Sequence, residues 1–414
     1  MVRKQQYPQR ILLLTQWHEP EPVTRQAVLA DGLVKRGYDV WVLTTFPSYP
    51  RGKTYPGYRQ RLVDVSASMP RVIRIPSIPS RSLSFLHRGV SYASFAISAS
   101  MLGIPRIPRP DLIWVYQPPP SVALPALLAK LVYRSPIVHE IQDMWPDTLV
   151  ASGLRKDGQL TSLIHRAMRW ILARVDHVVV ISPGFAKLLQ ARGTPPDRIT
   201  VIPNWSVAPE RAAPRPDGSP SAALRILYAG NVGPGQRLDV VVDAIAATND
   251  RLETSASIEL AVLGDGPALA QVREYALHRG VALEVMERVA PEVVPVVASE
   301  FDAMLVNLAA DPVFRTTIPS KLITYLAIGK PILAGLGGDG ADIVRTADAG
   351  IVFEPEDHAG AVAALTEFAM TPVERRREMG ANARAAFESD FQADRLLDRY
   401  DGLFQELLAN QCRS

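Results

Sequence analysis

Short apolar runs alternate with helix-length segments along almost the whole chain, in two successive series. In the first series the runs are RILLLTQ, DVWVLTT, DLIWVYQ, PIVHEIQ, DHVVVIS and ITVIPN. In the second series they are RILYAGN, IELAVLGDG, VALEVME, FDAMLVNL, KPILAG and GIVFEP. Runs rich in Val, Ile and Leu that alternate with helices are typical of parallel strands in βαβ units. The pattern therefore predicts an α/β fold with two doubly wound sheets.

The boundary between the two series falls at residues 207–224, which are rich in Pro, Ala and Ser and poor in large apolar side chains. We expect this segment to be a linker. Because 414 residues are too many for one ordinary core, we predict two Rossmann-like domains, at 1–206 and 225–388. The apolar spacing of residues 389–414 predicts a terminal helix that packs back toward the first domain. Two such domains would face a central cleft, where ligands of α/β folds bind.

Composition excludes several classes of protein. The one cysteine, Cys412, allows no internal disulfide and no cysteine-based metal site, which fits a reducing cytoplasm. A hydrophobic fraction of 47% is that of a globular enzyme. A long uncharged stretch lies between Arg88 and Arg106, is shorter than a membrane span and contains four serines. We expect it to form a helix that packs on a sheet or lies at a membrane surface.

Charge is distributed unevenly along the chain. Residues 1–210 hold 26 Lys and Arg against 13 Asp and Glu, whereas residues 211–414 hold 19 against 29. A basic first half suits an anionic surface, although drift in surface composition would give the same bias. Basic and aromatic clusters that would stack nucleic-acid bases are missing, so the sequence favours anionic phospholipid over nucleic acid.

Glycine-rich turns follow three strands of the second series, in YAGNVGPGQRLD, LGDGP and GGDGAD. Glycine lets backbone amides approach a ligand closely, although a tight strand-to-helix turn requires glycine anyway. No Walker motif is present, because IGKPI has Pro where Ser or Thr would hold magnesium. The turns predict a phosphate-binding edge that contains Gly230, Gly233, Gly235, Gly264 and Gly266.

The sequence IPSKLITYLAIGKPILAG predicts a turn, a helix and a buried strand. Pro319 and Ser320 form a helix start signal, in which the Ser320 side chain could cap free amides. The amides of a helix N-terminus attract phosphate oxygens, and Arg237, Arg315 and Lys321 could neutralise them. We expect this segment to anchor a phosphate group.

Polar residues end the strand in VHEIQDMWPD, in the first half of the chain. Asp143 follows this strand and is the acid that we expect in the cleft, although it could instead cap the next turn. His139 is more typical of a hydrogen-bonded core histidine than of a base. His18, Glu19 and Glu21 follow the first strand, on the same predicted edge. No Ser-His-Asp or metal-ligand spacing is present, so the sequence argues against hydrolysis and metal chemistry.

These blocks, in this order, resemble the retaining glycosyltransferases of family four, which have the GT-B fold. The similarity covers nearly the whole chain and is nearest to the N-acetylfucosamine-type transferases of O-antigen and capsule assembly. It implies that the C-terminal domain binds a sugar nucleotide, that the N-terminal domain binds the acceptor, and that transfer retains configuration without a cofactor or metal. Acceptors in this subgroup are polyprenyl-diphosphate-linked saccharides. The resemblance therefore implies a cytoplasmic protein that is peripheral on the inner face of the cytoplasmic membrane.

The resemblance also implies roles for individual residues. Many members have an Arg and a Lys, six positions apart, that both contact the donor diphosphate. Asn231 and Arg237 stand at these two positions, so only Arg237 keeps the positive charge. Thr316 and Thr324 replace two glutamates, the second of which grips the ribose, and Gln142 replaces a His that contacts the donor. The implied set is catalytic Asp143, Arg237 and Lys321; donor-binding Arg315, Pro319, Ser320, Thr324, Asn231 and the strand-end glycines; and acceptor-side His18, Glu19, Glu21 and Gln142.

Two other functions stay open. A sugar-nucleotide 2-epimerase shares the two-domain architecture and would need an acid and a base, for which Asp143 and His18 are the available residues. A non-catalytic member that binds a nucleotide sugar, or that scaffolds a polysaccharide assembly complex, would account for Asn231, Thr316 and Thr324 in place of charged residues.

Overall fold

The computed structural model describes residues 8–22, 24–80, 85–151, 158–206, 212, 223–252 and 257–411. The chain divides into two compact units. Unit 1 comprises Met1–Ile181, Phe185–Ile202 and Leu396–Ser414, and unit 2 comprises Ser182–Gly184 and Pro203–Arg395. Most of the expected linker and Cys412 lie outside the described residues.

Unit 1 contains a sheet in which, among the described residues, eight strands run in the order β3-β4-β2-β1-β5-β6-β7-β8. Neighbouring strands are parallel except for the antiparallel pair β3 and β4. The central strands are almost wholly buried, as their unbroken apolar runs predict. The strands are β1 (Arg10–Leu14), β2 (Asp39–Thr45), β3 (Asp64–Val65), β4 (Arg71–Ile75), β5 (Leu112–Gln117), β6 (Ile137–Ile141), β7 (His177–Val180) and β8 (Ile199–Val201).

Helices cover both faces of this sheet. One face packs against α2, α3, α5 and α6 through buried side chains that include Phe95, Ala126, Met168 and Phe185. Since α1 connects its strands in the opposite direction along the sheet, a right-handed crossover places it on the other face. The helices are α1 (Thr24–Lys35), α2 (Phe85–Ser98), the π-helix η1 (Ala99–Gly103), the short η2 (Ile104–Arg106), α3 (Ala123–Tyr133), α4 (Asp147–Ala151), α5 (Gln159–Leu172), α6 (Pro183–Ala191) and α15 (Ala393–Gln411).

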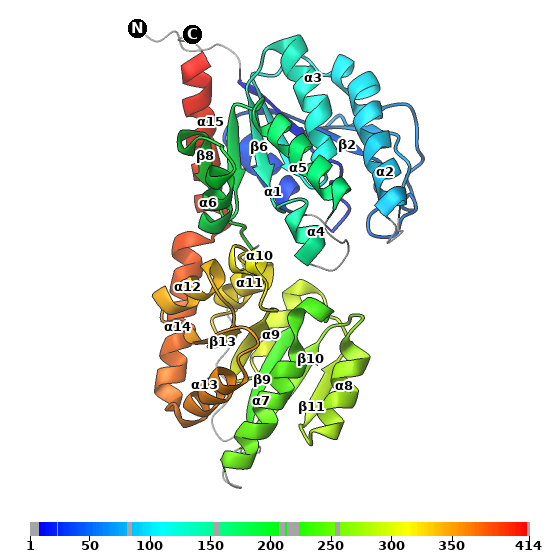
Figure 1. Ribbon diagram of the computed structural model, residues 1–414. Helices are drawn as coiled ribbons and strands as arrows, with labels where there is room; N and C mark the ends of the chain where they lie inside the picture. Colours follow the sequence, from blue (N-terminus) through cyan, green and yellow to red (C-terminus); the bar gives the residue numbers. More distant parts are fainter. Residues whose placement is uncertain are drawn as a thin grey trace. The chain divides into compact units, whose positions relative to one another are not determined.

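The terminal helix α15 packs on unit 1, beside β8 (Figure 1). Arg399 donates to the Val201 carbonyl at 2.5 Å. Asp398 pairs with Arg36, which follows α1, and the hydroxyl of Tyr38 donates to Asp401 at 2.5 Å. The last described helix of the chain therefore completes the first unit of the fold.

Unit 2 contains a parallel sheet in which, among the described residues, six strands run in the order β11-β10-β9-β12-β13-β14. The order reverses beside β9, which places the switch point of a doubly wound sheet between β9 and β12. The predicted α/β fold with parallel sheets is thus confirmed in both units. The strands are β9 (Leu224–Ala229), β10 (Ile258–Leu263), β11 (Leu283–Met286), β12 (Ala303–Asn307), β13 (Ile332–Gly335) and β14 (Gly350–Phe353).

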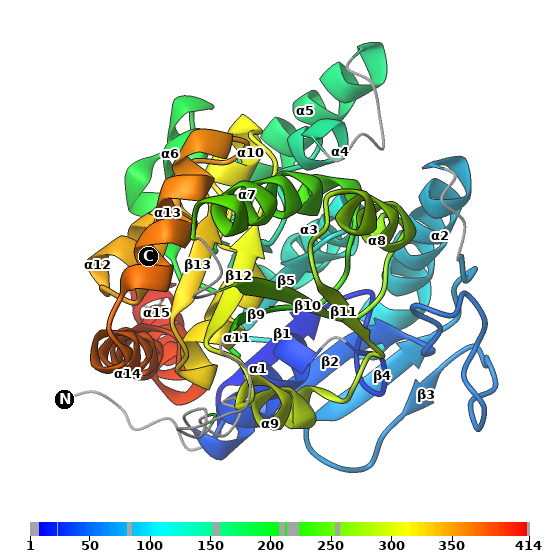
Figure 2. The ribbon, with the colours of Figure 1, turned by 90° about the horizontal axis from the view of Figure 1, so that it is seen from below.

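Two hydrophobic clusters lie on opposite faces of this second sheet. One joins it to α7, α8 and α13, with α7 and α13 side by side (Figures 1 and 2), and the other joins it to α11, α12 and α14. Among the described residues, no helix combines the length and the apolar character needed to cross a bilayer. The helices are α7 (Leu238–Arg251), α8 (Leu269–His278), α9 (Val294–Ala298), α10 (Pro312–Arg315), α11 (Ser320–Ile328), α12 (Asp339–Thr346), α13 (His358–Met370) and α14 (Val373–Asp390).

Candidate active site

Two glycine-rich turns at the strand ends of unit 2 pack against each other. Gly230, Gly264 and Gly266 have φ angles of 134°, 148° and 157°. A Cβ atom on Gly264 would lie 2.2 Å from the carbonyl oxygen of Gly230, and one on Gly266 would lie 2.2 Å from that of Val232. Because no side chain fits at such distances, the packing of the two turns already requires these glycines.

Helix α11 begins next to these turns. Pro319 is the residue before the first helical turn and Ser320 is the first helical residue, and no side chain caps the helix. The expectation that Ser320 caps the helix is therefore wrong, because its side chain starts one position too late to reach the first-turn amides. The amides at this N-terminus lack a side-chain cap and can donate hydrogen bonds to the oxygens of an anion.

The ammonium of Lys321 lies over the ring of Tyr228, 3.9 Å from its centroid, and donates to its hydroxyl. It also borders Gly230, where an added Cβ would lie 3.3 Å from Nζ. Burial lowers the pKa of Lys321 to about 8. Among the contacts that involve described residues, none joins Lys321 to a carboxylate. A cation in this setting gains stability from a bound anion.

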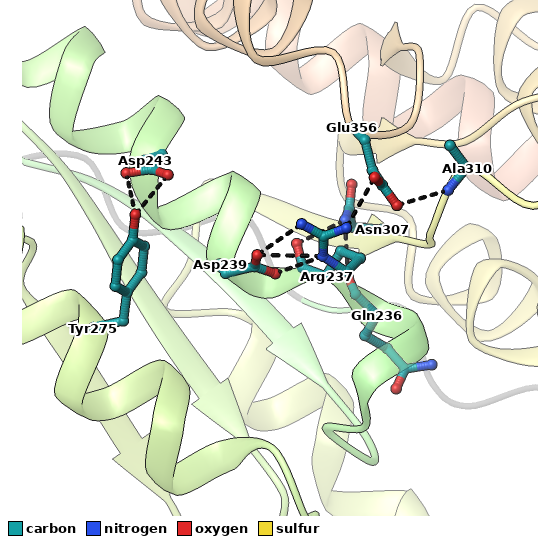
Figure 3. A network of polar contacts seen from close by, with 8 residues as sticks. All are labelled: Gln236, Arg237, Asp239, Asp243, Tyr275, Asn307, Ala310 and Glu356. Atoms are coloured by element: carbon teal, nitrogen blue, oxygen red, sulfur yellow. Dashed lines mark hydrogen bonds and ion pairs between the residues drawn. The ribbon is translucent and has the colours of Figure 1, made fainter. Parts of the chain in front are cut away.

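Arg237 is held quite differently (Figure 3). Its guanidinium forms ion pairs with Asp239 at 2.9 Å and Glu356 at 2.8 Å, and the hydrogen bond to Asp239 and the charges of both acids raise its pKa. Its backbone has a φ of 42°, and its carbonyl accepts from Asn307 at 3.1 Å. No contact between Arg237 and Lys321 is found among the described residues. Arg237 therefore ties the turn after β9 to the loop after β14.

The same turn contains two further glycines, Gly233 and Gly235. Gly233 lies on a groove of about 510 Å³ that Arg237 and Tyr275 also line, and the hydroxyl of Tyr275 donates to Asp243 at 2.7 Å (Figure 3). An added Cβ on Gly235 would make only ordinary contact with Phe314, at 3.5 Å. The glycines of this turn are thus less constrained than those that meet the turn after β10.

The donor-side residues of α10 and α11 that sequence analysis selected are engaged locally. Arg315 pairs with Glu354 at 2.9 Å. The hydroxyl of Thr316 donates to the Val313 carbonyl at 2.8 Å, and that of Thr324 donates to the Ser320 carbonyl at 3.3 Å. Asn231 is exposed, and its carbonyl accepts from the Tyr228 hydroxyl at 2.7 Å. These bonds fix the local shape of the strand edge. Arg237 and Arg315 are both paired with carboxylates, so Lys321 is the cation of the three for which the described residues provide no carboxylate.

Two tyrosines at this edge were missed by sequence analysis. Besides Tyr228 under Lys321, Tyr325 of α11 donates to the Ala229 carbonyl at 2.9 Å and accepts from the Ala229 amide at 2.8 Å. The bonds fix the second turn of α11 against the end of β9. The available signal was an aromatic residue at the end of a strand that runs into a glycine turn, since a buried tyrosine hydroxyl requires a partner.

Asp143 of unit 1 is a half-buried acid that follows β6, and partial burial raises the pKa of its carboxyl. No hydrogen bond or ion pair to this carboxylate is found among the described residues. The amide of Trp145 donates to the backbone carbonyl of Asp143, at 2.9 Å, so the side chain does not cap the turn. A half-buried acid for which the described residues provide no partner is suited to hold or accept a proton.

Asp143 lines a cavity of about 400 Å³ whose wall is aromatic. We call this cavity the aromatic pocket. The ring of Trp17 lies 5.1 Å from that of Tyr49 and 6.4 Å from that of Tyr92, which in turn lies 6.2 Å from that of Trp145. A wall of aromatic rings next to a carboxylate can bind a sugar, because ring faces cover apolar sugar faces while the acid binds hydroxyls. A second cavity that Asp143 lines, of about 690 Å³, extends between α5 and α6.

The acceptor-side acids do not project freely. The carboxylate of Glu21 accepts from the amides of His18 at 3.0 Å, Ser48 at 2.8 Å and Tyr49 at 2.7 Å. It therefore joins the two loops that carry Trp17 and Tyr49. Burial and the charge of Arg74 lower the pKa of His18 to about 4, so its ring is neutral near pH 7. Glu19 contributes a backbone carbonyl, to which Arg74 donates at 2.6 Å.

Gln142 belongs to a buried network that sequence analysis did not foresee. It donates to Glu140 at 2.5 Å, and the same carboxylate accepts from Arg25 at 2.7 Å, Trp114 at 3.1 Å and the hydroxyl of Tyr400. A fully buried glutamate requires such partners. The signal was Glu140 itself, an acid within an otherwise apolar strand. The network joins α1, α15 and the strand that leads to Asp143.

The neighbouring His139 is fully buried, which lowers its pKa to about 4, and its Nε2 lies 2.9 Å from Gln117 Oε1. The prediction of a core histidine is confirmed. No group of three or more His, Cys, Asp and Glu that could hold a metal ion is found within the described part of the chain.

Comparison with known proteins agrees with this fold. Residues 22–205 match the glycosyl transferase 4-like domain, and residues 223–370 match the glycosyl transferases group 1. The chain is 30% identical, over 73% of its length and 76% of the relative, to the putative colanic acid biosynthesis glycosyl transferase WcaI of Escherichia coli K12. The chain belongs to glycosyltransferase family four.

Solved structures show the same architecture. Sucrose-phosphate synthase of Thermosynechococcus elongatus superposes with a TM-score of 0.69 and 18% identity, over 97% of this chain and all of that one. Anabaena HepE in complex with UDP and glucose gives a TM-score of 0.64 and 13% identity, over 95% and 99% of the two chains. The predicted GT-B fold and the family resemblance are confirmed, and this glycosyltransferase carries its most distinctive polar groups at the strand ends of its two sheets.

Proposed function

We propose that this glycosyltransferase moves a sugar, with retention of configuration and without a metal, from a nucleotide-sugar donor to a polyprenyl-diphosphate-linked saccharide. The product would serve surface polysaccharide assembly at the inner face of the cytoplasmic membrane. Relatives named for colanic acid biosynthesis and O-antigen mannosyl transfer support the pathway class. HepE, a structure of the same fold, holds UDP, which supports the donor class.

The observation that carries the proposal is the setting of Lys321. Its ammonium is partly buried and lies over a neutral tyrosine, and no contact among described residues joins it to a carboxylate. It adjoins Gly230 at the end of β9 and the N-terminus of α11, where uncapped amides favour anions. The negative charge of a donor diphosphate would balance the positive charge of Lys321.

In the proposed reaction, an acceptor hydroxyl attacks the anomeric carbon on the face from which the nucleoside diphosphate departs. The bond from the anomeric carbon to the diphosphate oxygen breaks while the new glycosidic bond forms. Lys321 and the amides of Ser320 and Lys321 stabilise the negative charge that develops on the departing oxygen. The acceptor proton passes to that phosphate oxygen.

Asp143 would orient the acceptor hydroxyl by accepting a hydrogen bond from it, until the proton passes to the phosphate oxygen. The aromatic pocket would bind the acceptor saccharide by stacking on Trp17, Tyr49, Tyr92 and Trp145. Glu21 shapes this pocket by fixing its loops, rather than by touching the acceptor. Arg237 shapes the turn after β9, because its two carboxylates already neutralise it.

Two measurements test the function. Thermal-shift screening against UDP-, GDP- and dTDP-sugars finds the donor, since a bound donor raises the unfolding temperature by mass action. Transfer of the labelled sugar to a membrane-extract acceptor, followed by assignment of the product's anomeric configuration, then tests retention. We expect a product with the donor's configuration in the presence of a chelator. An inverted product, or transfer that stops on chelation, would contradict the proposal.

A non-catalytic nucleotide-sugar-binding role is the second candidate. It is favoured by Thr324, whose hydroxyl bonds within its own helix where the family resemblance implies a ribose-binding glutamate. Donor binding without transfer, across donors and membrane extracts, would support this role over the enzyme.

A further inference from the structure

One face of unit 1 exposes many large apolar side chains. Helices α2 and α3 pack against each other on the same face of the sheet (Figure 1). We call their outward side the α2–α3 face. It consists of Leu86, Val90, Ile97 and Met101 from α2 and η1, and Leu124, Leu128, Leu131 and Val132 from α3.

The exposed residues follow helical periodicity. Residues 86, 90 and 97 are separated by four and seven positions, and residues 124, 128 and 131 by four and three, so each helix carries one apolar stripe. The exposed fractions reach 73% for Leu86, 59% for Ile97, 69% for Met101 and 79% for Leu131. Soluble proteins rarely expose a continuous apolar patch of this kind unless it binds a partner.

The charges of this segment have one sign. Residues 85–134 contain Arg88, Arg106, Arg109, Lys130 and Arg134, and their one acid is Asp111. The carboxylate of Asp111 faces the sheet edge, where it accepts from the amide of Arg10 at 2.7 Å. Lys130 is ion-paired with Asp176 at 2.7 Å, and Arg88 lies on the side of α2 that lines the aromatic pocket. The positive charge beside the apolar stripes therefore comes from Arg106, Arg109 and Arg134.

Three of these arginines gather at one end of the α2–α3 face. The hydroxyl of Tyr133, in the last turn of α3, donates to the carbonyls of Ile104 and Ile107 at 2.7 and 3.0 Å. This contact brings exposed Arg134 close to the loop with exposed Arg106 and Arg109. An apolar surface with a basic end matches the acyl boundary and phosphate headgroups of an anionic bilayer.

We propose that the α2–α3 face docks on an anionic lipid bilayer. A second copy would bring its own basic end to the same surface, where like charges repel, so a membrane is the better occupant. The opposite side of α2 supplies Arg88, Ser91 and Tyr92 to the aromatic pocket. A bilayer in contact with α2 would therefore lie next to the pocket assigned to the acceptor. The inference rests on the proposed function for its biological setting.

Vesicle flotation of the full chain tests the docking without any need for turnover. We expect binding to vesicles of phosphatidylglycerol and phosphatidylcholine, and little binding to phosphatidylcholine alone. The double substitution Ile97→Glu and Leu131→Glu places two charges on the α2–α3 face and should weaken binding by about tenfold or more. The double substitution Arg106→Gln and Arg134→Gln should weaken it less, in proportion to lost headgroup attraction.

The matched control is Leu277→Glu combined with Val296→Glu, in unit 2. Leu277 is 82% exposed at the end of α8, so this change has the same chemistry at a comparably exposed site and should leave vesicle binding unchanged. Equal binding by wild type and the Ile97→Glu, Leu131→Glu variant would overturn the proposal. So would a wild-type dimer in sedimentation that this variant converts to a monomer. Transfer activity does not enter either readout, so a failure here is distinct from a failure of the proposed function.

Discussion

The two cations at the strand ends of unit 2 are held in opposite ways. Lys321 lies over the neutral ring of Tyr228, and burial lowers its pKa to about 8. Arg237 is bound by Asp239 and Glu356, which raise its pKa. Burial without an opposite charge disfavours a charged group, whereas a carboxylate pair satisfies it. The first arrangement is suited to bind an anion, and the second to hold two loops together.

The same contrast separates two acids of unit 1. Asp143 is half-buried, and no partner of its carboxylate is found among the described residues, whereas Glu21 accepts hydrogen bonds from three backbone amides. Because partial burial without a partner disfavours the charged form of an acid, the Asp143 carboxylate is suited to bind a ligand hydroxyl. Glu21, whose hydrogen bonds are satisfied, instead fixes the loops at the same edge of the sheet.

The largest expected effect is that of Lys321→Met. Removal of the cation should lower the transfer rate by about 10² to 10³, the usual loss when one group that stabilises developing negative charge is removed. The unfolding temperature should stay the same or rise, because a buried charge is lost. Initial rates with labelled donor and thermal melts without ligand measure both quantities. A rate close to that of wild type would break the contrast between the two cations.

Asp143→Asn should lower the turnover rate by about 10² if the ionised carboxylate orients the acceptor hydroxyl by accepting its hydrogen bond. Because burial raises its pKa, the wild-type rate should fall on the acid side at a higher pH than an ordinary aspartate would give. The variant should lose this acid limb. Glu21→Gln is the matched control: it should raise KM through loosened loops and keep the limb. A limb that persists in Asp143→Asn would show that another group titrates.

The fold was predictable because its signals are local and repeated. Unbroken apolar runs such as those of β5 and β6 mark strands that are buried on both faces. The alternation with helices then fixes a parallel, doubly wound order. The pairing of α15 with α1 depends on Tyr400 and Arg25, which lie far apart in the sequence, so local patterns do not reveal it.

The sequence predicted that the candidate site lies at the ends of strands. It did not predict which side chains contact each other there. Lys321 and Arg237 look alike in the sequence, since both follow turns and both are cations. Only the fold brings Glu356 to Arg237 and Tyr228 to Lys321. Ser320 was misjudged for a simpler reason: the helix begins at this residue, so Ser320 lies one position after the N-cap position that a capping role requires.

The pH dependence of donor binding sharpens the contrast. Lys321 is charged below a pH of about 8 and becomes neutral as the pH rises through it. The protonated form attracts a diphosphate, so affinity should be full near pH 7 and fall by up to about tenfold by pH 9, where about one Lys321 in ten is charged. Isothermal titration with the identified donor measures this fall. Lys321→Arg, which remains charged, should reduce it, and an identical fall in this variant would assign the titration to the donor itself.

The smallest expected effect is that of Arg237→Gln. Both of its ion pairs are partly exposed, so their loss should lower the free energy of unfolding by about 1 kcal/mol or less and slow transfer only a few-fold. Glu356→Gln should do the same. The double substitution should add little, because the two residues act through one contact. Thermal melts and initial rates of the three variants measure this. A loss of transfer as large as that of Lys321→Met, at an unchanged unfolding temperature, would show that Arg237 leaves its carboxylates to bind the donor.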